Sequence, residues 1–545
     1  MTSDTHQPEA RWNPQRTLGL TAGFALLTAV MTWPQVLVLK THAVDHQDVF
    51  FNLWRLRWIA HALAASPGAL FNGNVFYPET GVLAFSDAML VEGVLAAPLF
   101  WIGVPPVLLH NLWLVGPIVA SSVGITLLAR HLTGNTPASM IAGIVFAFAP
   151  YRFEHYMHME LQWTVWIPWA FWALQRTIES GKWRFGLLMG VFVALQMASS
   201  VYYGVFLILL SAVVGALQLL TVPRRRLMRT VGALLLGGAV AGSASWLYSR
   251  PYTAASTQVG FRSMHEVKRF SAQPRDYRVA TPTNLLYGPA LSRSERRLSP
   301  GILAVVLALA GLMLLPPTPT LIAYLTALAV AFELSLGANG YLYPFLYEYT
   351  SVFRGLRAPA RASVYCLFFV AVLAAYATAA LTRTGSSLTR WLVSAVICAG
   401  LLLEYRVAPL ELIAYPNDPP ALFKVLARLP TGVVAEFPMP KRNSPPYQDP
   451  RYAYMSTFHW MPLVNGYSGF YPRSYLNRLV RLADFPDPES VASLRRENVR
   501  YVIIHDEGDS DTARLRMVEH LLALGVRPLG EFADGWSRAT LMELQ

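Results

Sequence analysis

The sequence predicts an α-helical polytopic membrane protein of about eleven transmembrane helices, followed by a C-terminal extracytoplasmic α/β domain. Of 545 residues, 54% are hydrophobic and only 14% are charged, whereas a soluble domain carries about 25% charged residues. Apolar segments long enough to cross a bilayer recur throughout residues 17–409. Residues 410–545 instead contain charged, proline-rich and alternating stretches, and their length suits one further domain.

Eleven segments have the length and apolar composition expected of spans. The first is too long for the apolar core of a signal peptide and has no small-residue cleavage site after it, so we expect a retained span. The segments are 18–38, 107–129, 138–150, 161–175, 185–200, 203–222, 230–248, 300–316, 319–336, 362–381 and 391–409.

The positive-inside rule sets the expected orientation in the plasma (inner) membrane. With the N-terminal tail (1–16) in the cytoplasm, most of the short basic loops lie inside. If Leu90–Ile102 were a span, most of these loops would lie outside instead. We therefore expect Leu90–Ile102 to be an interfacial helix. The outer loops are then 40–106, 250–300 and 337–361, with 410–545 also outside. The basic residues of the inner loops are Arg130, Arg176, Lys182, Arg184, Arg224, Arg225, Arg226, Arg229, Arg383 and Arg390.

The distribution of charge argues against a nucleic-acid-binding protein, and the cysteine content argues against a disulfide-stabilised one. The formal charge of +12 could indicate a nucleic-acid partner, but the basic residues lie in short loops between apolar segments, so no nucleic acid is expected. Cys366 and Cys398 both fall inside apolar segments, so no disulfide framework is expected.

Alternation and turn signals predict the elements of the C-terminal domain. Asp487 is expected to cap a helix that precedes the second strand. The predicted strands are Val433–Phe437, Val499–His505, Pro528–Ala533 and Ala539–Leu544, with an amphipathic helix over Thr512–Leu524.

An acidic cluster directly after the first span is the strongest functional signal. Asp45, His46 and Asp48 precede an amphipathic segment, Val49–Leu63. Carboxylates and imidazoles beside so much apolar sequence are costly unless they are used. Asp48 is expected to cap the helix; capping does not exclude a functional role, in which its carboxylate accepts a proton from an acceptor hydroxyl or orients that hydroxyl. Asp45 and His46 compete for the same role.

A second cluster lies between two expected spans, over residues 151–160. Glu154 and His158 are four residues apart and would share one face of a helix. Two histidines with acidic neighbours suit a divalent metal, with His46 or Asp48 as a further ligand, although the spacing matches no established metal motif. Ordinary interfacial polarity is the alternative. The candidates are Glu160 for catalysis and Arg152, Glu154, His155 and His158 for substrate binding.

A third cluster is basic and is expected on the outer side. Arg354, Arg357 and Arg361 precede the tenth span and suit phosphate recognition; contact with lipid headgroups is the alternative. Tyr202 and Tyr203 add aromatic surface on the same side. The glycine- and aromatic-rich segment 465–472 is expected to be a turn, a lid or a surface on which a sugar stacks.

This arrangement resembles the GT-C-type integral membrane glycosyltransferases, the group of protein mannosyltransferases, the aminoarabinose transferase of lipid A and related lipopolysaccharide glycosyltransferases. Members have a large first outer loop that opens with an acidic residue and contains interfacial helices, matched here by Asp48, residues 49–63 and residues 90–102. A second span with a basic inner loop is matched by 107–129 and Arg130-His-Leu-Thr-Gly134. The spacing of Asp45 and Asp48 departs from the paired-aspartate form.

The resemblance implies transfer of a sugar from a polyprenyl-phosphate-linked donor to an unknown envelope glycan, lipid or protein acceptor, at the outer face and among membrane lipids. Asp48 would activate the acceptor hydroxyl, and the arginines would stabilise the departing phosphate. Two other functions stay open. A transporter or flippase for a lipid-linked saccharide would need polar sites in mid-membrane, which the expected spans lack; a non-catalytic envelope assembly protein is compatible with the same architecture.

Overall fold

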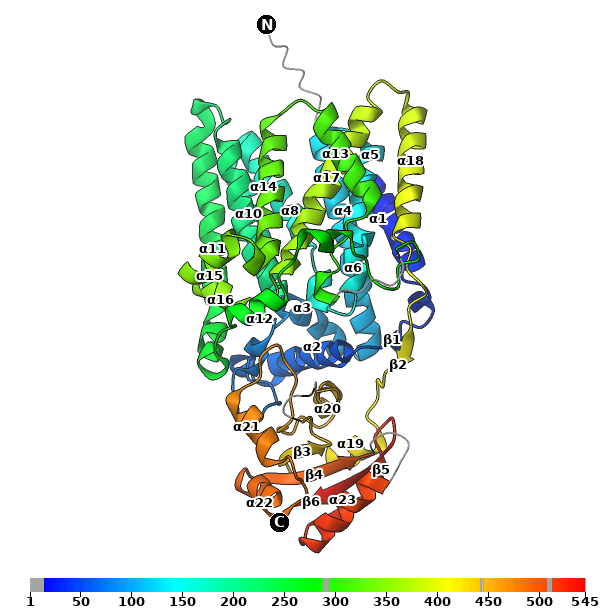
Figure 1. Cartoon of the computed structure of the whole chain (residues 1–545), viewed down its shortest axis with the longest axis vertical. Helices are drawn as coiled ribbons and strands as arrows, with labels where there is room; N and C mark the ends of the chain where they lie inside the picture. The colour runs from blue at the N-terminus through cyan, green and yellow to red at the C-terminus, as the bar shows by residue number, and fades with distance from the viewer. Residues whose placement is uncertain (1–13, 288–293, 442–443, 445, 507–511, 545) are drawn as a thin grey trace.

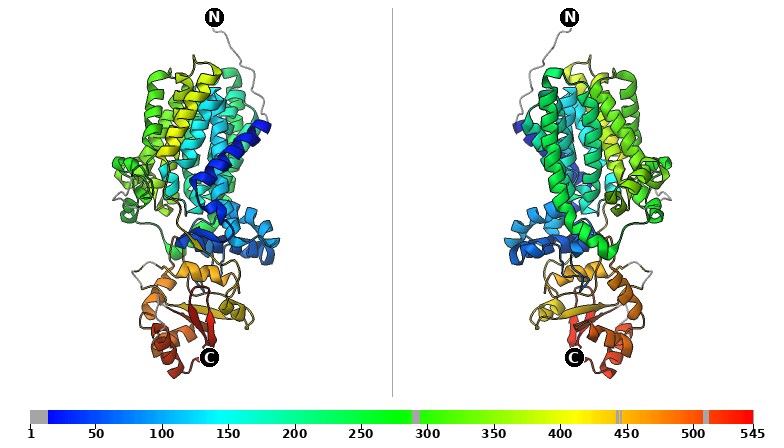
Figure 2. Two further views of the ribbon diagram at one scale, coloured as in Figure 1. Left: turned by 90° about the vertical axis from the view of Figure 1, so that its right-hand side faces the viewer. Right: turned by 90° about the vertical axis from the view of Figure 1, so that its left-hand side faces the viewer.

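A bundle of apolar helices forms one end of the molecule and a four-stranded sheet forms the other (Figure 1). The computed structural model describes all residues except 1–13, 288–293, 442–443, 445, 507–511 and 545, so most of the expected cytoplasmic tail lies outside the described residues. Two further views show the short helices α2 (Gln47–Ala65) and α3 (Leu90–Trp101) lying between bundle and sheet (Figure 2).

Six of the described helices are long and apolar enough to cross a membrane, so the count of eleven spans stays a prediction. The other five expected segments fall on α1 (Pro14–Met31), α5 (Thr136–Phe148), α8 (Trp166–Ser180), α9 (Trp183–Ser199) and α13 (Ile302–Leu314). The six long helices are α4 (Pro106–Thr133), α10 (Val201–Leu219), α11 (Arg224–Val259), α14 (Pro319–Leu336), α17 (Ser363–Leu381) and α18 (Ser387–Glu404).

Several predicted span boundaries are wrong. The helix of the first span ends at Met31 rather than 38, and that of the last ends at Glu404 rather than 409. Helix α11 continues through Pro251 to Val259, so the first ten residues of the expected loop 250–300 are helical. Tyr252, Thr253 and Ser256 on this extension line a cavity described below. Helix α8 begins at Trp166 rather than 161, because the preceding residues form the short helices α6 (Pro150–Glu154) and α7 (Met159–Gln162).

Glycines allow the closest helix contact in the bundle. A Cβ atom on Gly186 of α9 would lie 2.0 Å from the carbonyl oxygen of Ala233 in α11, and one on Gly190 would lie 2.3 Å from that of Gly237. Small residues let membrane helices approach in this way, so α9 and α11 pack backbone against backbone.

Helices α2 and α3 form where the sequence predicts them, but the cap of α2 differs. The N-cap is His46, whose Nδ1 accepts a hydrogen bond from the Asp48 backbone N–H. Asp48 therefore lies in the first turn, where the helix dipole stabilises its negative charge. Its carboxylate does not cap the helix and is available for other contacts. Gly93 of α3 packs directly on Ile59 of α2.

The predicted strands of the C-terminal part are confirmed. Strand β3 (Val433–Phe437) pairs parallel with β4 (Val499–His505), which pairs antiparallel with β6 (Arg538–Glu543). Strand β5 (Arg527–Ala533) pairs antiparallel with β6, so β3 and β5 are the two edge strands. Asp487 caps α22, as predicted, by accepting from the Ser490 N–H. The helices of this part are α19 (Ala421–Leu426), α20 (Asp449–Ser456), α21 (Arg473–Arg481), α22 (Pro488–Arg496) and α23 (Thr512–Ala523).

The C-terminal part shares a hydrophobic core with residues 40–106. Trp54 of α2 and Phe76 are buried in one cluster with Tyr452, Tyr475 and Leu541. A two-stranded sheet, β1 (His42–Val44) with β2 (Leu412–Ala414), joins the same two regions next to Asp48. The position of the sheet relative to α2 is thus fixed by burial and by backbone pairing.

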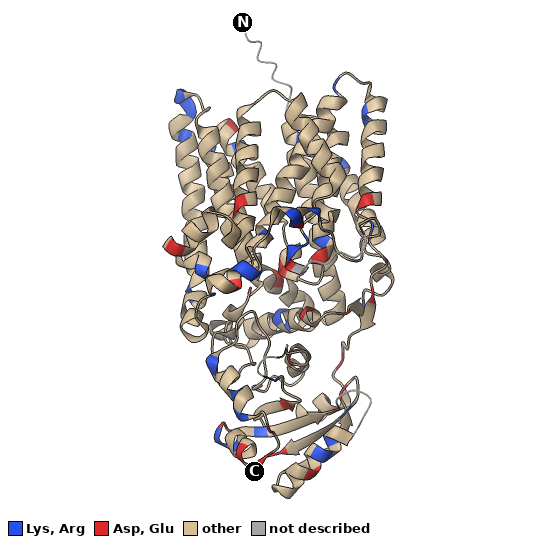
Figure 3. Ribbon diagram, viewed as in Figure 1, with Lys and Arg blue, Asp and Glu red and all other residues tan. Residues whose placement is uncertain are grey.

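Charged residues avoid the middle of the long helices and gather at their ends (Figure 3). A belt of Lys, Arg, Asp and Glu lies at the level of the short helices α6, α12 (Met264–Arg269), α15 (Leu342–Tyr349) and α16 (Ser351–Gly355). The start of α1 and the basic start of α11 lie at the end opposite the sheet (Figure 1).

This arrangement predicts opposite sides of the membrane for two reporters. A reporter joined after Arg226 should show a cytoplasmic location, and one joined after Gln545 an extracytoplasmic location, because the loops at the Arg226 end carry the excess of arginine. Paired alkaline phosphatase and green fluorescent protein fusions measure both. The same side for both positions would contradict the topology.

Candidate active site

A cavity of about 1080 Å³ opens where α2, α10 and α11 meet the C-terminal part. Its polar end holds Asp48, Asp87 and Glu160, and segment 467–471 of the C-terminal part closes one wall. Its other end is lined by apolar side chains of α10, α11 and α16, among them Val205, Leu209, Trp246 and Phe353.

The Asp48 carboxylate is held by groups from three separate segments. Its Oδ2 lies 2.6 Å from Nδ1 of His158, and its Oδ1 accepts a hydrogen bond of 2.8 Å from the Tyr467 hydroxyl. The His46 Nδ1 is 3.8 Å away. The Asp48 side chain is 13% exposed and lines the cavity, so the first and second clusters of the sequence meet at one point.

Electrostatics keep Asp48 ionised. Burial opposes its charge, but the charge and hydrogen bond of His158, with smaller effects of His46 and Tyr467, hold the pKa of Asp48 below its ordinary value. Burial likewise opposes the charge of His158, but Asp48 raises the pKa of His158 above its ordinary value. The pair therefore forms an aspartate–imidazolium ion pair.

A second acidic group flanks Asp48. Glu160 makes an ion pair of 3.3 Å with the buried Arg55, whose guanidinium also donates to the Asp87 carbonyl at 2.7 Å. The Asp87 carboxylate accepts from the Val201 N–H at 2.8 Å. Burial and the charge of Glu160 raise the pKa of Asp87 to about 6, so Asp48 and Asp87 differ strongly in acidity within one cavity.

The three arginines of the basic cluster have different surroundings. Arg361 is paired with Glu295 through contacts of 2.7 and 3.3 Å and lies over the Tyr202 ring. The guanidinium of Arg357 lies 4.9 Å from the Phe270 ring centre and lines the cavity; no described carboxylate is within ion-pair distance of it. Arg354 is not among the cavity residues, and its guanidinium donates to backbone carbonyls of α15. Arg357 is therefore the cavity arginine with the least local compensation.

Several predicted site residues lie outside the cavity. Asp45 is exposed and does not line it. The buried Arg152 donates to the carbonyls of Leu161 and Gln162, which fixes the chain between α6 and α7. Burial raises the pKa of Glu154 to about 7 although Arg297 contacts it at 3.1 Å.

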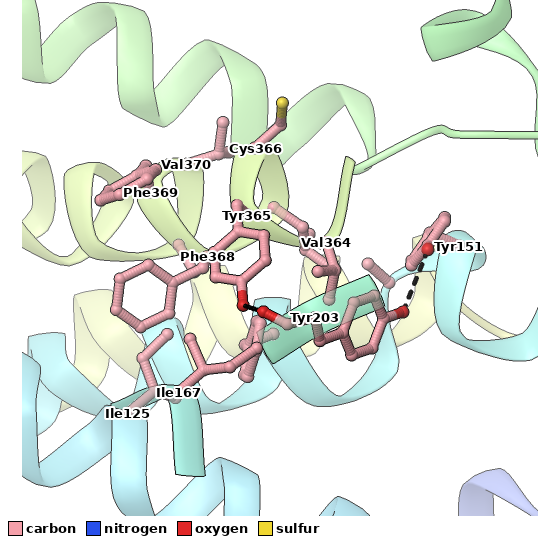
Figure 4. Packing of buried hydrophobic residues seen from close by; sticks show 14 of the residues in the cluster. Ile125, Tyr151, Ile167, Tyr203, Val364, Tyr365, Cys366, Phe368, Phe369 and Val370 are labelled. Carbon is pink, nitrogen blue, oxygen red and sulfur yellow. Dashed lines mark hydrogen bonds between the residues drawn. The ribbon is translucent and has the colours of Figure 1, made fainter. Parts of the chain in front are cut away.

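His155 and Tyr203 are core residues. The His155 ring packs on Tyr151 at 4.8 Å, and burial lowers the pKa of His155 to about 3. Tyr203 points into the apolar core, where its hydroxyl meets that of Tyr151 at 3.2 Å (Figure 4). Its neighbour Tyr202 does line the cavity, and the Tyr202 hydroxyl accepts a hydrogen bond of 2.6 Å from the backbone N–H of Arg357.

Sequence reasoning missed several cavity residues, among them Arg55, Asp87, Glu295 and Tyr467. Arg55 and Asp87 lie in the predicted outer loop 40–106, where an arginine on an amphipathic helix and a lone aspartate before an apolar segment were available signals. Tyr467 lies in the glycine- and aromatic-rich segment expected to form a turn, a lid or a sugar-stacking surface. Glu295 carried no signal, because only its contact with Arg361 reveals it.

No group of three or more His, Cys, Asp or Glu side chains is placed to hold a metal ion within the described ranges. His155, expected as one ligand, faces Tyr151 instead of Asp48. His158 and His46 approach Asp48, but both use Nδ1 there. The predicted combination of His155 and His158 with Asp48 is therefore wrong as a set of ligands.

Comparison with known proteins identifies the fold. No protein-family model and no curated protein sequence matches the chain. The arabinofuranosyltransferase AftD from Mycobacteria aligns with a TM-score of 0.64 at 15% identity, covering 98% of this chain and 40% of that chain. This chain thus corresponds to 40% of the length of AftD, and the predicted resemblance to GT-C-type glycosyltransferases is confirmed at the level of the fold.

Two other glycosyltransferase structures show weaker likeness. The Archaeoglobus fulgidus oligosaccharyltransferase aligns with a TM-score of 0.48 at 12% identity, over 91% of this chain and 70% of that chain. ArnT from Cupriavidus metallidurans aligns with a TM-score of 0.38 at 12% identity, over 97% and 98% of the two chains.

The Asp48–His158 pair predicts a pH-dependent stability. Because the folded-state pKa of His158 is raised, its stabilisation is complete below about pH 6.5 and is lost as the pH rises through the folded-state value. His158→Gln should lower the free energy of unfolding by about 1.5–3 kcal/mol at about pH 6 and by less at about pH 9. Chemical denaturation of the purified protein at both pH values measures this.

His155→Gln is the matched control, because the pKa of His155 is lowered to about 3 and this side chain stays neutral across the range. Its cost should be the same at both pH values. If His158→Gln also lowered the free energy of unfolding by the same amount at both pH values, the ion pair between Asp48 and His158 would be contradicted.

Proposed function

We propose that this protein is a membrane glycosyltransferase that transfers a sugar from a polyprenyl-phosphate-linked donor to an envelope glycan, lipid or protein acceptor at the outer face. The observation that carries the proposal is one cavity that joins an ionised carboxylate, an arginine for which the described residues provide no acidic partner, and an apolar groove. The fold shared with AftD supports the reaction class.

The two ends of the cavity suit the two parts of a lipid-linked donor. The apolar end lies between helices long enough to span a membrane, α10 and α11, and would receive the polyprenyl chain. Arg357 lies toward the polar end, and its planar guanidinium suits two oxygens of a phosphate. The sugar would then lie between Arg357 and Asp48.

The reaction follows from these positions. The acceptor oxygen attacks the anomeric carbon of the donor sugar, the bond from that carbon to the phosphate oxygen breaks, and the polyprenyl phosphate leaves with the electron pair. Asp48 takes the proton of the acceptor hydroxyl, while His158 and Tyr467 keep its carboxylate oriented. Arg357 stabilises the negative charge on the leaving phosphate.

Asp48→Asn should lower transfer by roughly 100-fold or more, the usual weight of a positioned base, with normal expression. Asp45→Asn is the matched control: it removes the same charge three residues away, outside the cavity, and should leave transfer unchanged. Release of polyprenyl phosphate from the lipid-linked sugars of the native membrane measures the activity. Near-normal release by the Asp48 variant would show that Asp48 is not the base and would leave Glu160 and Asp87 to be tested. A non-catalytic assembly protein would also tolerate the Asp48→Asn substitution.

The donor phosphate gives a separate prediction for Arg357. Arg357→Lys should raise the donor concentration needed for half-maximal transfer although the charge is kept, because the two-donor fork is lost. Arg357→Ala should raise it further, by roughly tenfold or more.

Arg354→Lys is the control, because the Arg354 side chain donates to the carbonyls of Tyr347 and Glu348 outside the cavity. Titration of purified variants with lipid-linked sugar measures each requirement. Equal donor requirements for wild type, Arg357→Lys and Arg357→Ala would show that Arg357 does not bind the donor.

A further inference from the structure

A second cavity, of about 630 Å³, lies on the other side of α2. Asp48, Phe51 and Arg55 of α2 line the first cavity, whereas Arg57 and His61 line the second. Because an α-helix turns by about 100° per residue, these two sets of side chains point in opposite directions. The second cavity is therefore separate from the candidate active site and shares only this helix with it.

The second cavity is basic. The cations Lys40 and Arg57 line it, and Asp418 is the one carboxylate among the described lining residues. His61 also lines it, but burial and the charge of Arg57 lower the pKa of its imidazole. The start of α4 at Pro106, which carries the partial positive charge of a helix N-terminus, forms part of the same wall. An anion in this cavity would face positive charge from three separate segments.

Arg57 has no acidic partner within the described part of the chain. Its guanidinium donates to the Thr457 carbonyl at 3.2 Å and lies against the rings of Phe458 and Trp460, at 4.6 and 5.8 Å. Burial lowers the pKa of Arg57; its hydrogen bond with the Tyr454 hydroxyl opposes that shift, but no described carboxylate does. A guanidinium removed from water without a carboxylate is costly, and a bound anion would supply the missing charge.

The rim of this cavity is apolar and exposed. Trp101, at the end of α3, is 57% exposed and Ile102 is 76% exposed, and Trp101 anchors to α2 through a hydrogen bond of 3.1 Å to the Ala60 carbonyl. Exposed tryptophan and isoleucine at the end of an apolar helix, next to the start of the long apolar helix α4, are typical of a bilayer interface.

We propose that the second cavity binds the headgroup of an anionic lipid, with Arg57 and Lys40 on the phosphate and the acyl chains along Trp101 and Ile102. The basic interior accounts for the headgroup and the exposed rim accounts for the chains. A soluble anion would use only the interior. This proposal does not depend on the activity assigned to the first cavity.

Native mass spectrometry of the full chain tests the proposal, after purification with an equal mixture of phosphatidylglycerol and phosphatidylcholine. The wild type should retain one phosphatidylglycerol in preference to phosphatidylcholine. Arg57→Gln should weaken that retention by roughly tenfold or more, and Lys40→Gln, at an exposed position that folding does not require, should weaken it in the same direction.

Lys424→Gln is the matched control, since Lys424 is exposed on α19 and does not line the cavity; its lipid retention should equal that of the wild type. Equal retention by the wild type and Lys40→Gln would overturn the proposal. So would displacement of the lipid by millimolar inorganic phosphate, which would make the ligand a soluble anion.

Discussion

The arrangement of this molecule depends on keeping one largely covered carboxylate ionised at the wall of the first cavity. Asp48 is 13% exposed, and a buried charge is tolerated only when donors and opposite charges surround it. His46, the N-cap of α2, contributes a smaller part of this stabilisation from 3.8 Å. The closer contacts come from His158, between two bundle helices, and from Tyr467, in the C-terminal part. The carboxylate is therefore satisfied only when all three regions are assembled, and the candidate site forms only in the complete fold.

Helix α2 is the element through which this assembly is made. One face carries Asp48 and Arg55 into the first cavity, and another carries Arg57 and His61 into the second. Its apolar side chains, such as Trp54, are buried together with the C-terminal part. Since interiors are close-packed, a shift of the sheet would move α2 and alter the contact between Tyr467 and Asp48. The C-terminal part thus acts as a wall of the site.

Local sequence signals located the elements and pointed to segments that line the polar end of the first cavity, but they did not reveal the partners of each side chain. Apolar length and alternation were enough to predict β3, β4, α2 and α3, because burial sets those patterns within one segment. The acidic cluster was visible because charge is costly in apolar surroundings. The separation of Arg357 from Arg361 was not visible: both belong to one run of sequence, and only the distant Glu295 neutralises one of them. For the same reason, His155 and His158 looked alike, although one packs in the core and the other contacts Asp48.

The central claim is that the chain transfers a sugar from a lipid carrier to an envelope acceptor. Comparing the envelope of cells with and without the gene tests it most directly, by mass spectrometry of both the glycans and the lipid-linked sugars. The account predicts that the deletion strain lacks one sugar in an envelope glycan, glycolipid or glycoprotein and accumulates the corresponding polyprenyl-phosphate sugar. Unchanged glycans together with an unchanged pool of lipid-linked sugars would contradict it.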